Sequence, residues 1–296
     1  MKPLVSIIVA TYRRDTTLLK ALYSLCEQSY SNIEIVLVDD NDETNWNLNV
    51  KNIVTDIKDK FPNILIQYIV NHPNRGSAET RNIGIHAANG EYITFLDDDD
   101  IYLSEKIERQ VLFMEAQKLD YSITDLYLYS GNGKLVDRRI RSYIKSTEAQ
   151  SLFEYHLKYH LTGTDAMMFR RDYVLSIGGF PPINVGDEFY LMQRAIEKDG
   201  RFGYLAGCDI KAYIHTGEGG LSSGRGKIDG ENDLYDHKKK YFEQLEPQTV
   251  KYIKVRHQVV LAYAYLRMKS MRDCLKNAVL GFFISPRMFL GLLLNR

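Results

Sequence analysis

The sequence predicts an α/β fold, a mostly parallel sheet with helices on both faces and a helical C-terminal extension. Three observations support this prediction. Strand-like and helical patterns alternate over the first hundred residues, as in folds with right-handed crossovers. The strand-like runs are largely apolar, which is typical of strands buried on both faces. Beyond about Asp229 the chain shows helical patterns and no strand pattern.

The first hundred residues contain the clearest elements. Leu18, Leu22 and Leu25 give one helix an apolar face, and a second helix is expected between Leu48 and Phe61. A third helix carries Arg81. The intervening strands, rich in β-branched and aromatic residues, are predicted at residues 4–10, 33–38, 64–70 and 92–96.

After residue 100 the pattern changes. Gly131-Asn132-Gly133 predicts a hairpin between strands at 121–129 and 134–138. A helix is expected over 187–198. The segment from Gly217 to Lys227 holds five glycines in eleven residues and is predicted to be a mobile loop. Short strands are also expected at residues 166–169, 202–205 and 211–214.

Composition indicates an ordinary cytoplasmic enzyme. The 296 residues carry a formal net charge of +0, so no overall field favours nucleic acid. Cys26, Cys208 and Cys274 are far apart and read as reduced thiols. The first strand follows Met1-Lys2-Pro3 directly, so no signal peptide is expected. No apolar run reaches the roughly 18 residues of a transmembrane helix.

Four consecutive carboxylates, Asp97 to Asp100, follow the strand at 92–96. Ligands of open α/β sheets bind at the carboxyl ends of the strands. Such a cluster repels itself unless a cation is present, and Mg²⁺ and Mn²⁺ prefer oxygen ligands. The alternative is a solvated acidic turn that caps the helix expected after Ser104.

Several motifs occur in a fixed order: Val5 to Tyr12, Val36-Leu37-Val38-Asp39-Asp40, Arg81-Asn82-Ile83-Gly84 before Gly90-Glu91-Tyr92, and Leu96 to Asp100. Together they resemble the inverting, nucleotide-sugar-dependent glycosyltransferases of family 2, which have the GT-A fold. The resemblance covers about the first 225 residues. It implies a catalytic domain at 1–228, with a nucleotide-binding half at 1–100 and an acceptor-binding half at 101–228, and an extension at 229–296.

The resemblance also implies a metal site. The family's Asp-x-Asp motif fits Asp97 and Asp99, with Asp99 expected to hold Mn²⁺ or Mg²⁺ and Asp97 or Asp98 to contact the ribose or support the metal. A His such as His215 often reaches the metal or the diphosphate in related enzymes. The alternative for His215 is a structural role.

The nucleotide sugar is expected at the ends of the first two strands. By the resemblance, Ala10, Thr11 and Tyr12 line its site, and Asp40 accepts hydrogen bonds from the base. Asp39 is either a second contact or a buried turn-forming residue.

Three cations are candidates for the diphosphate. Arg75 or Arg81 neutralises its charge, although Arg81 has the alternative of packing its stem and pairing with an acid. Arg225, on the glycine-rich loop, is expected to close over the diphosphate as part of a lid; the alternative is an ordinary surface charge.

A general base is expected at the start of the helix over 187–198. An inverting transfer needs a carboxylate to take the proton of the acceptor hydroxyl. The family supplies it from a Glu-Asp pair with Arg six residues later. Here the acids are exchanged: Glu188 lies six residues before Arg194, and Asp187 precedes it. We favour Glu188; Asp187 is the alternative base, or only a helix cap.

The last thirty residues combine basic side chains with two short apolar stretches separated by Ser285-Pro286-Arg287. Such a tail suits peripheral contact with the inner face of the cell membrane and a lipid-linked acceptor. Packing on the catalytic domain or in a homodimer is equally consistent.

The function that fits best is transfer from a nucleoside-diphosphate sugar, with UDP favoured, to a glycan or lipid-linked acceptor in cell-surface polysaccharide synthesis. A nucleotidyltransferase is the first alternative, but Ala10 to Arg14 lacks the glycines of a phosphate loop after the first strand. A non-catalytic nucleotide-sugar-binding module is the second, and it would be expected to lose the acidic run or the base.

Overall fold

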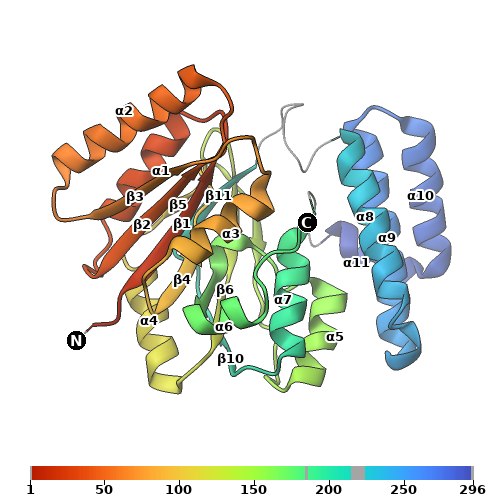
Figure 1. The fold of residues 1–296 in the computed structure, drawn as a ribbon. Helices are drawn as coiled ribbons and strands as arrows, with labels where there is room; N and C mark the ends of the chain where they lie inside the picture. The colour runs from red at the N-terminus through yellow and green to blue at the C-terminus, as the bar shows by residue number, and fades with distance from the viewer. Residues whose placement is uncertain (1, 184–185, 215–223, 295–296) are drawn as a thin grey trace. The chain divides into compact units, whose positions relative to one another are not determined.

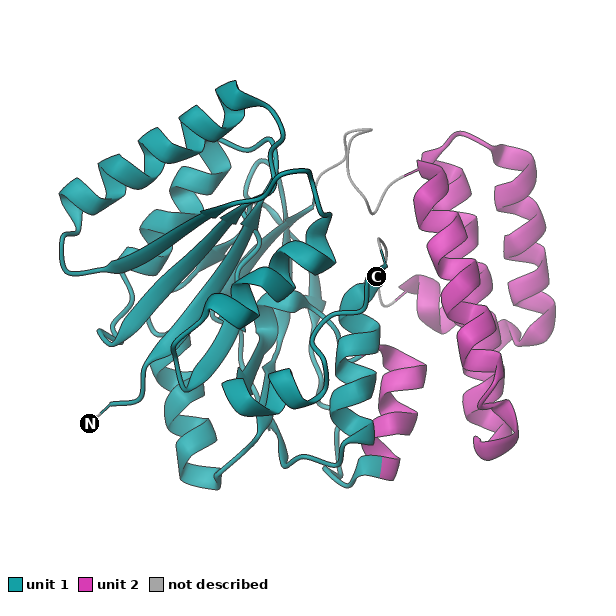
Figure 2. Ribbon diagram, viewed as in Figure 1, with its two compact units in different colours: residues 1–149, 161–214 teal, residues 150–160, 215–296 magenta. Residues whose placement is uncertain are grey.

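The structure, a computed structural model, describes residues 2–183, 186–214 and 224–294. It contains two compact units (Figures 1 and 2). The first unit comprises Met1–Ala149 and Leu161–Ile214, and the second comprises Gln150–His160 and His215–Arg296. The domain boundary expected after residue 228 stays a prediction.

The first unit is built around a seven-stranded sheet. Its strands pair in parallel except β9, which runs antiparallel to both of its neighbours, β4 and β6. The predicted mostly parallel α/β sheet is therefore confirmed. In spatial order the strands are β10 (Phe202–Leu205), β6 (Tyr121–Thr124), β9 (Met167–Arg170), β4 (Tyr92–Phe95), β1 (Val5–Thr11), β2 (Ile33–Asp39) and β3 (Leu65–Val70).

Helices cover both faces of this sheet (Figure 1). The chain moves from β1 to β2 to β3 in one direction and returns past β1 to β4, so right-handed crossovers place α1 and α2 on one face and α3 on the other. The helix α3 approaches β1 closely, because a Cβ at Gly84 would lie 2.5 Å from Ile8 Cγ2. The helices of this unit are α1 (Thr16–Cys26), α2 (Thr44–Lys60), α3 (Ser77–Ala87), α4 (Lys106–Gln117), α6 (Arg171–Ser176) and α7 (Asp187–Glu197).

The core lies along the middle strands. Every residue of β2 and β4 is buried, whereas the edge strand β3 is partly exposed. The apolar character of the central strands in the sequence follows from burial on both faces.

A second sheet of four strands has the order β5-β11-β7-β8, with β5 at Ile101–Tyr102, β11 at Ile210–Ile214, β7 at Leu126–Ser130 and β8 at Leu135–Arg139. The predicted hairpin is confirmed as β7 and β8. The single strand expected over 121–129 is wrong, because the chain leaves the large sheet at Asp125. That carboxylate accepts hydrogen bonds from Arg141 N (2.9 Å), the Tyr204 hydroxyl (2.7 Å) and Gly207 N (3.0 Å), which fixes the change of sheet.

The second unit is helical in its described part. Its helices are α5 (Ala149–Tyr159), α8 (Gly224–Lys239), α9 (Pro247–Arg267), α10 (Met271–Ile284) and α11 (Pro286–Leu294). Val255 and Val259 of α9 pack against Phe289 of α11. The helical extension is thus confirmed, but the mobile loop expected as far as Lys227 is wrong from Gly224 onward, where α8 begins. None of the described helices is both long and apolar enough to cross a membrane.

Candidate active site

The expected site residues follow neighbouring strands that end at one edge of the large sheet. Strand β1 pairs in parallel with β2 and with β4, so the carboxyl ends of all three strands meet there. Thr11 ends β1 and Tyr12 follows it, Asp39 ends β2 and Asp40 follows it, and the acidic run 97–100 comes after β4. This edge is where open α/β sheets bind their ligands.

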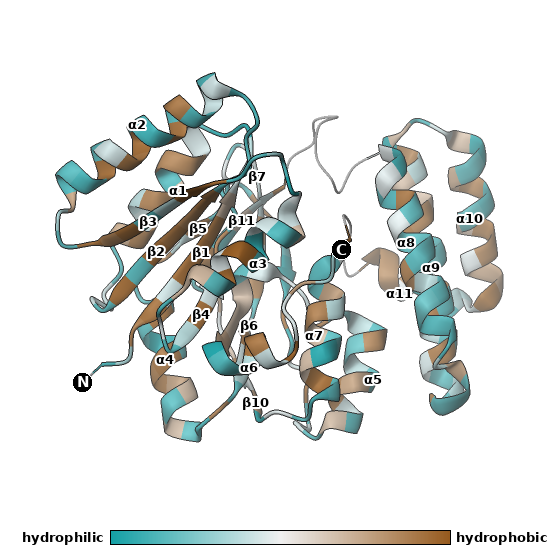
Figure 3. Cartoon of the chain, viewed as in Figure 1, coloured by the Kyte–Doolittle hydropathy of each residue, from teal (hydrophilic) through white to brown (hydrophobic). Residues whose placement is uncertain are grey.

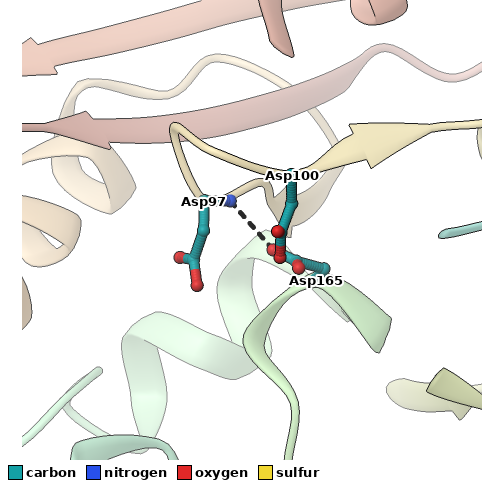
Figure 4. Close-up of side chains that lie close together, drawn as sticks. All are labelled: Asp97, Asp100 and Asp165. Carbon is teal, nitrogen blue, oxygen red and sulfur yellow. Dashed lines mark hydrogen bonds between the residues drawn. The ribbon is translucent and has the colours of Figure 1, made fainter. Parts of the chain in front are cut away.

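Three carboxylates form a cluster at this edge. One oxygen from each of Asp97, Asp100 and Asp165 lies within 4.8 Å of the others, and Figure 4 shows them approaching from two segments. Asp165 lies in a short 3₁₀ turn (Thr164–Ala166) just before β9. Because β9 is antiparallel to β4, with Tyr92 opposite Arg170, the same register continued beyond the strands places Asp165 opposite Asp97. Asp97 N donates a 2.9 Å hydrogen bond to Asp165 Oδ1.

The negative charges of these three carboxylates repel one another, and burial removes those of Asp100 and Asp165 from water. Burial and the negative charge of Asp97 raise the pKa of Asp165 to about 7. Burial and the charge of Asp165 raise the pKa of Asp100 well above its usual range. A divalent cation would relieve this repulsion, and an all-carboxylate donor set suits Mg²⁺ or Mn²⁺. The residues present therefore fit the expected metal.

The other two acids of the run have different partners. Asp98 Oδ2 accepts hydrogen bonds from Thr11 Oγ1 (2.8 Å) and Tyr12 N (3.2 Å), which ties the acidic run to the end of β1. Burial and the charge of Asp99 raise the pKa of Asp98 to about 7. Asp99 Oδ2 accepts a 3.0 Å hydrogen bond from Arg14 and is not in the three-carboxylate cluster. Its expected role as a metal ligand stays a prediction.

Arg81 joins the acidic run to the start of α7. Its guanidinium donates to Asp97 Oδ1 at 2.7 Å and to Asp187 Oδ2 at 3.1 Å. Burial alone would lower the pKa of Arg81, but the charges of Asp97 and Asp187 outweigh it and raise that pKa. The structure shows the pairing with acids that was one interpretation of Arg81, and its expected role toward the diphosphate stays a prediction.

Helix α7 begins at the two candidate bases. Gly186 precedes it with a φ of +84°, a conformation that favours glycine. Asp187 is buried and forms an ion pair with Arg81. By contrast, no described residue donates a hydrogen bond to the carboxylate of the half-buried Glu188. Burial, reinforced by the charge of Asp187, raises the pKa of Glu188 to about 7. Within residues 2–183, 186–214 and 224–294, Glu188 is therefore the one of these two acids whose carboxylate accepts no hydrogen bond.

The loop that leads into α3 is held by Asp40. Its carboxylate accepts hydrogen bonds from Arg75 N (2.8 Å), Gly76 N (2.9 Å) and the Asn71 side chain (2.9 Å). The side chain of Arg75 is exposed. Asp39 is fully buried and accepts hydrogen bonds from side chains of β3 and α2, so the structure shows the structural role considered for it. Contact of Asp40 with a base stays a prediction.

The remaining expected residues are placed as follows. Ala10 is half-buried near the end of β1. His215 lies outside the described residues. Arg225 lies in the first turn of α8, where its Nε is 3.5 Å from Asp229 Oδ1 and its side chain is 77% exposed. A lid role for Arg225 stays a prediction.

The sequence reasoning missed three residues of this edge: Asp165, Arg14 and Lys106. Lys106 is fully buried and donates to Thr94 Oγ1 (2.7 Å) and to the Tyr102 hydroxyl (2.8 Å). Burial lowers the pKa of Lys106 to about 7. The Tyr102 hydroxyl in turn contacts the carbonyl oxygen of Asp165 at 2.9 Å, so this pair supports the cluster. An acid directly before an expected strand was the one available signal for Asp165.

An open, mostly parallel sheet with carboxylates at the ends of its strands is the arrangement of α/β proteins that bind their ligand at this edge. The chain belongs to the glycosyl transferase family 2, whose sequence model matches residues 6–175. The family suggested by the motif order is thereby confirmed.

Two relatives illustrate the similarity in sequence. An uncharacterized glycosyltransferase of Haemophilus influenzae is 38% identical over 129 residues, which cover 42% of this chain and 49% of that protein. The Escherichia coli protein named UDP-Glc:alpha-D-GlcNAc-diphosphoundecaprenol beta-1,3-glucosyltransferase WfaP is 38% identical over 127 residues, covering 42% and 47%. The chain spans about half the length of these curated relatives.

Solved structures show the same fold. S. aureus TarS 1-349 in complex with UDP-GlcNAc has a TM-score of 0.60 and 16% identity, with 94% of this chain and 91% of that chain covered. The mannosyltransferase PcManGT from Pyrobaculum calidifontis, in complex with GDP-Man and Mn²⁺, has a TM-score of 0.60 and 17% identity, covering 99% and 81%. At these identities the likeness shows the GT-A fold alone.

Proposed function

We propose that this protein is a metal-dependent inverting glycosyltransferase. It moves a sugar from a nucleoside-diphosphate sugar, of the UDP class, to a hydroxyl of a glycan or lipid-linked acceptor in cell-surface polysaccharide synthesis. The observation that carries the proposal is the Arg81 bridge, because it holds the start of α7, and with it Glu188, beside Asp97 of the acidic cluster.

The donor and acceptor classes are inferred from the relatives' names. WfaP and the E. coli relative WfgD, 29% identical over 136 residues, are both named as transferring glucose from UDP-Glc to a GlcNAc-diphosphoundecaprenol. A lipid-linked acceptor places the reaction at the inner face of the cell membrane.

The metal is proposed to bind at the carboxylates that follow β4 and precede β9. Asp97, Asp100 and Asp165 offer oxygen ligands in one cluster, and Asp99 remains the ligand that the family resemblance implies. When bound, Mg²⁺ or Mn²⁺ would offset the negative charge that develops on the departing diphosphate. Thr11 and Tyr12 donate hydrogen bonds to Asp98 and lie at the same edge of the sheet. They are proposed to line the nucleotide site.

Proton transfer is assigned to Glu188. In an inverting transfer, the acceptor oxygen forms its bond to the anomeric carbon while the bond to the diphosphate oxygen breaks, and the diphosphate leaves with the electron pair. The hydroxyl proton passes to the Glu188 carboxylate, whose pKa of about 7 matches a base that works near neutral pH. Asp187 positions this residue through Arg81 and takes no proton itself.

The proposal is tested by incubating the protein with a panel of nucleotide sugars and either Mn²⁺ or Mg²⁺. Release of nucleoside diphosphate, accelerated by a lipid-linked GlcNAc acceptor and stopped by a chelator, is the expected result. The anomeric configuration of the product, measured by NMR, should be inverted. Retention of configuration would overturn the mechanism, and formation of a nucleotide sugar from nucleoside triphosphate and sugar phosphate would indicate a nucleotidyltransferase.

A further inference from the structure

Exposed apolar side chains are concentrated near the C-terminal end. Among the described residues, twenty large hydrophobic side chains are exposed, and twelve of them lie within residues 263–294. This segment comprises only about a tenth of the chain, so scattered exposure of the ordinary kind does not account for it. Figure 3 shows the hydrophobic residues along α10 and α11.

Helix α10 has its large apolar side chains on its outer side. Met271, Leu275, Val279, Phe282 and Phe283 are exposed, Leu275 by 65% and Phe283 by 80%. Their spacing places them on one side of the helix, and we call them the α10 stripe. A surface helix of a water-soluble domain normally turns such a stripe toward the core.

The inner side of α10 carries fewer large apolar residues, and Ala278 and Ile284 pack from it against the cluster of Val255, Val259 and Phe289. Asn277 and Gly281 are the buried residues of this helix. A Cβ at Gly281 would lie 3.0 Å from the Phe289 ring and 3.2 Å from Gln258 Cβ, so α10 approaches α9 and α11 closely here. The helix is therefore already packed on its inner side, and of the stripe Phe282 also reaches that packing, because its ring meets the Phe289 ring edge-on at a centroid distance of 6.0 Å.

Helix α11 adds to the apolar surface. Leu290, Leu293 and Leu294 are exposed by 49%, 50% and 82%, whereas Phe289 of the same helix is buried against α9. We call the α10 stripe and these three leucines the C-terminal apolar face.

The charge of this part of the chain indicates what covers the face. From Pro247 to the last residue the sequence has nine Lys and Arg and a single acid, Asp273, although the whole chain has 38 residues of each sign. Arg272 and Lys276 are exposed on α10; since successive helical residues are about 100° apart, Arg272 lies among the residues of the stripe and Lys276 lies at its border. A second copy would bring the same positive charge to the contact, whereas an anionic lipid surface complements it.

We propose that the C-terminal apolar face binds the surface of an anionic lipid bilayer. The Phe and Leu side chains enter the boundary between headgroups and acyl chains, and the neighbouring Lys and Arg contact the headgroups. This inference does not depend on the proposed activity. With that activity, it would keep the enzyme at the surface where a lipid-linked acceptor resides.

The test is flotation of the full-length protein with phosphatidylglycerol-containing vesicles. The variant L275E/F283E places two carboxylates in the stripe, and its flotation should fall about tenfold or more because charge is costly in an apolar interface. The matched control is L112E on α4, since Leu112 is 61% exposed and lies outside the face. This control should float like the wild type. Equal loss in both variants would overturn the proposal.

The second part of the test measures how the binding to vesicles depends on charge. R272E/K276E should reduce flotation with anionic vesicles, added salt should weaken wild-type binding, and vesicles of phosphatidylcholine alone should bind less. Light scattering measures the oligomeric state of the same samples. If the wild type does not float but forms a dimer that L275E/F283E dissociates, the face is an interface between copies and the lipid proposal is wrong. Unchanged thermal melting and circular dichroism establish that each variant is folded.

Discussion

The backbone N–H of Asp97 donates a 2.9 Å hydrogen bond to Asp165, a residue 68 positions further along the chain. This contact joins the acidic run after β4 to the turn before β9. The candidate metal site is therefore built from two segments that are distant in the sequence.

Asp165→Asn should leave the fold intact and weaken metal binding. The asparagine oxygen can still accept from Asp97 N, but the substitution removes one charge from a self-repelling cluster. Without metal, the variant should melt at or above the wild-type temperature. The rise in melting temperature that Mn²⁺ produces in the wild type should be lost. A full Mn²⁺-dependent rise in the variant would remove Asp165 from the site.

Asp99→Ala tests which acids of the run hold the metal. If Asp99 is a ligand, transfer should be abolished and metal-dependent donor binding weakened, while Asp98→Asn should retain both more fully. The second variant is a matched control because its amide oxygen can still accept from Thr11 and Tyr12. Donor binding is measured by calorimetry with and without Mn²⁺. Wild-type turnover that persists in a chelator would contradict the metal-dependent mechanism altogether.

Glu188→Gln should lower turnover by about two orders of magnitude or more with donor affinity nearly unchanged, because the lost acceptor acts in the transition state. Asp187→Asn should behave differently. It removes one partner of Arg81 and should lower the free energy of unfolding by about 1–3 kcal/mol, with a smaller effect on turnover. If Asp187→Asn were inactive and Glu188→Gln active, the two assignments would be exchanged.

The rate of transfer should fall as the pH is lowered through about 7. The pKa of Glu188 is raised to about 7, so below that pH the carboxyl is protonated and cannot take the acceptor proton. The pKa of Asp98 is also about 7, so the same profile is needed for Asp98→Asn. If the rate of Asp98→Asn still falls as the pH is lowered through about 7, the titrating group is not Asp98, as expected for Glu188. If this fall in rate were absent in Asp98→Asn, the titrating group would be Asp98.

The parallel half of the fold could be predicted because its signals are local. Apolar runs in β1, β2 and β4 follow from burial on both faces, and the acids after β4 directly continue a strand. The same local reading placed Asp187 and Glu188 at the start of a helix, and the structure has α7 beginning at Asp187.

The rest of the site depended on relations across long stretches of chain. Asp165 joins the cluster only because β9 runs antiparallel to β4, and no local pattern specifies a strand's direction. The pairing of Arg14 with Asp99 spans 85 residues. The change of sheet at Asp125 likewise depends on Tyr204 and Gly207, which come much later.

The hydrogen bonds of Asp40 restrict how an anion can be held at this edge. The N–H groups of Arg75 and Gly76, which directly precede α3, already point at a carboxylate. In phosphate loops, free backbone N–H groups of this kind form the cradle for the anion. Here a built-in negative charge occupies both donors. If the proposed diphosphate binds near this loop, side chains and a cation would have to neutralise its charge, and its binding should be far more sensitive to their removal than binding in a backbone cradle.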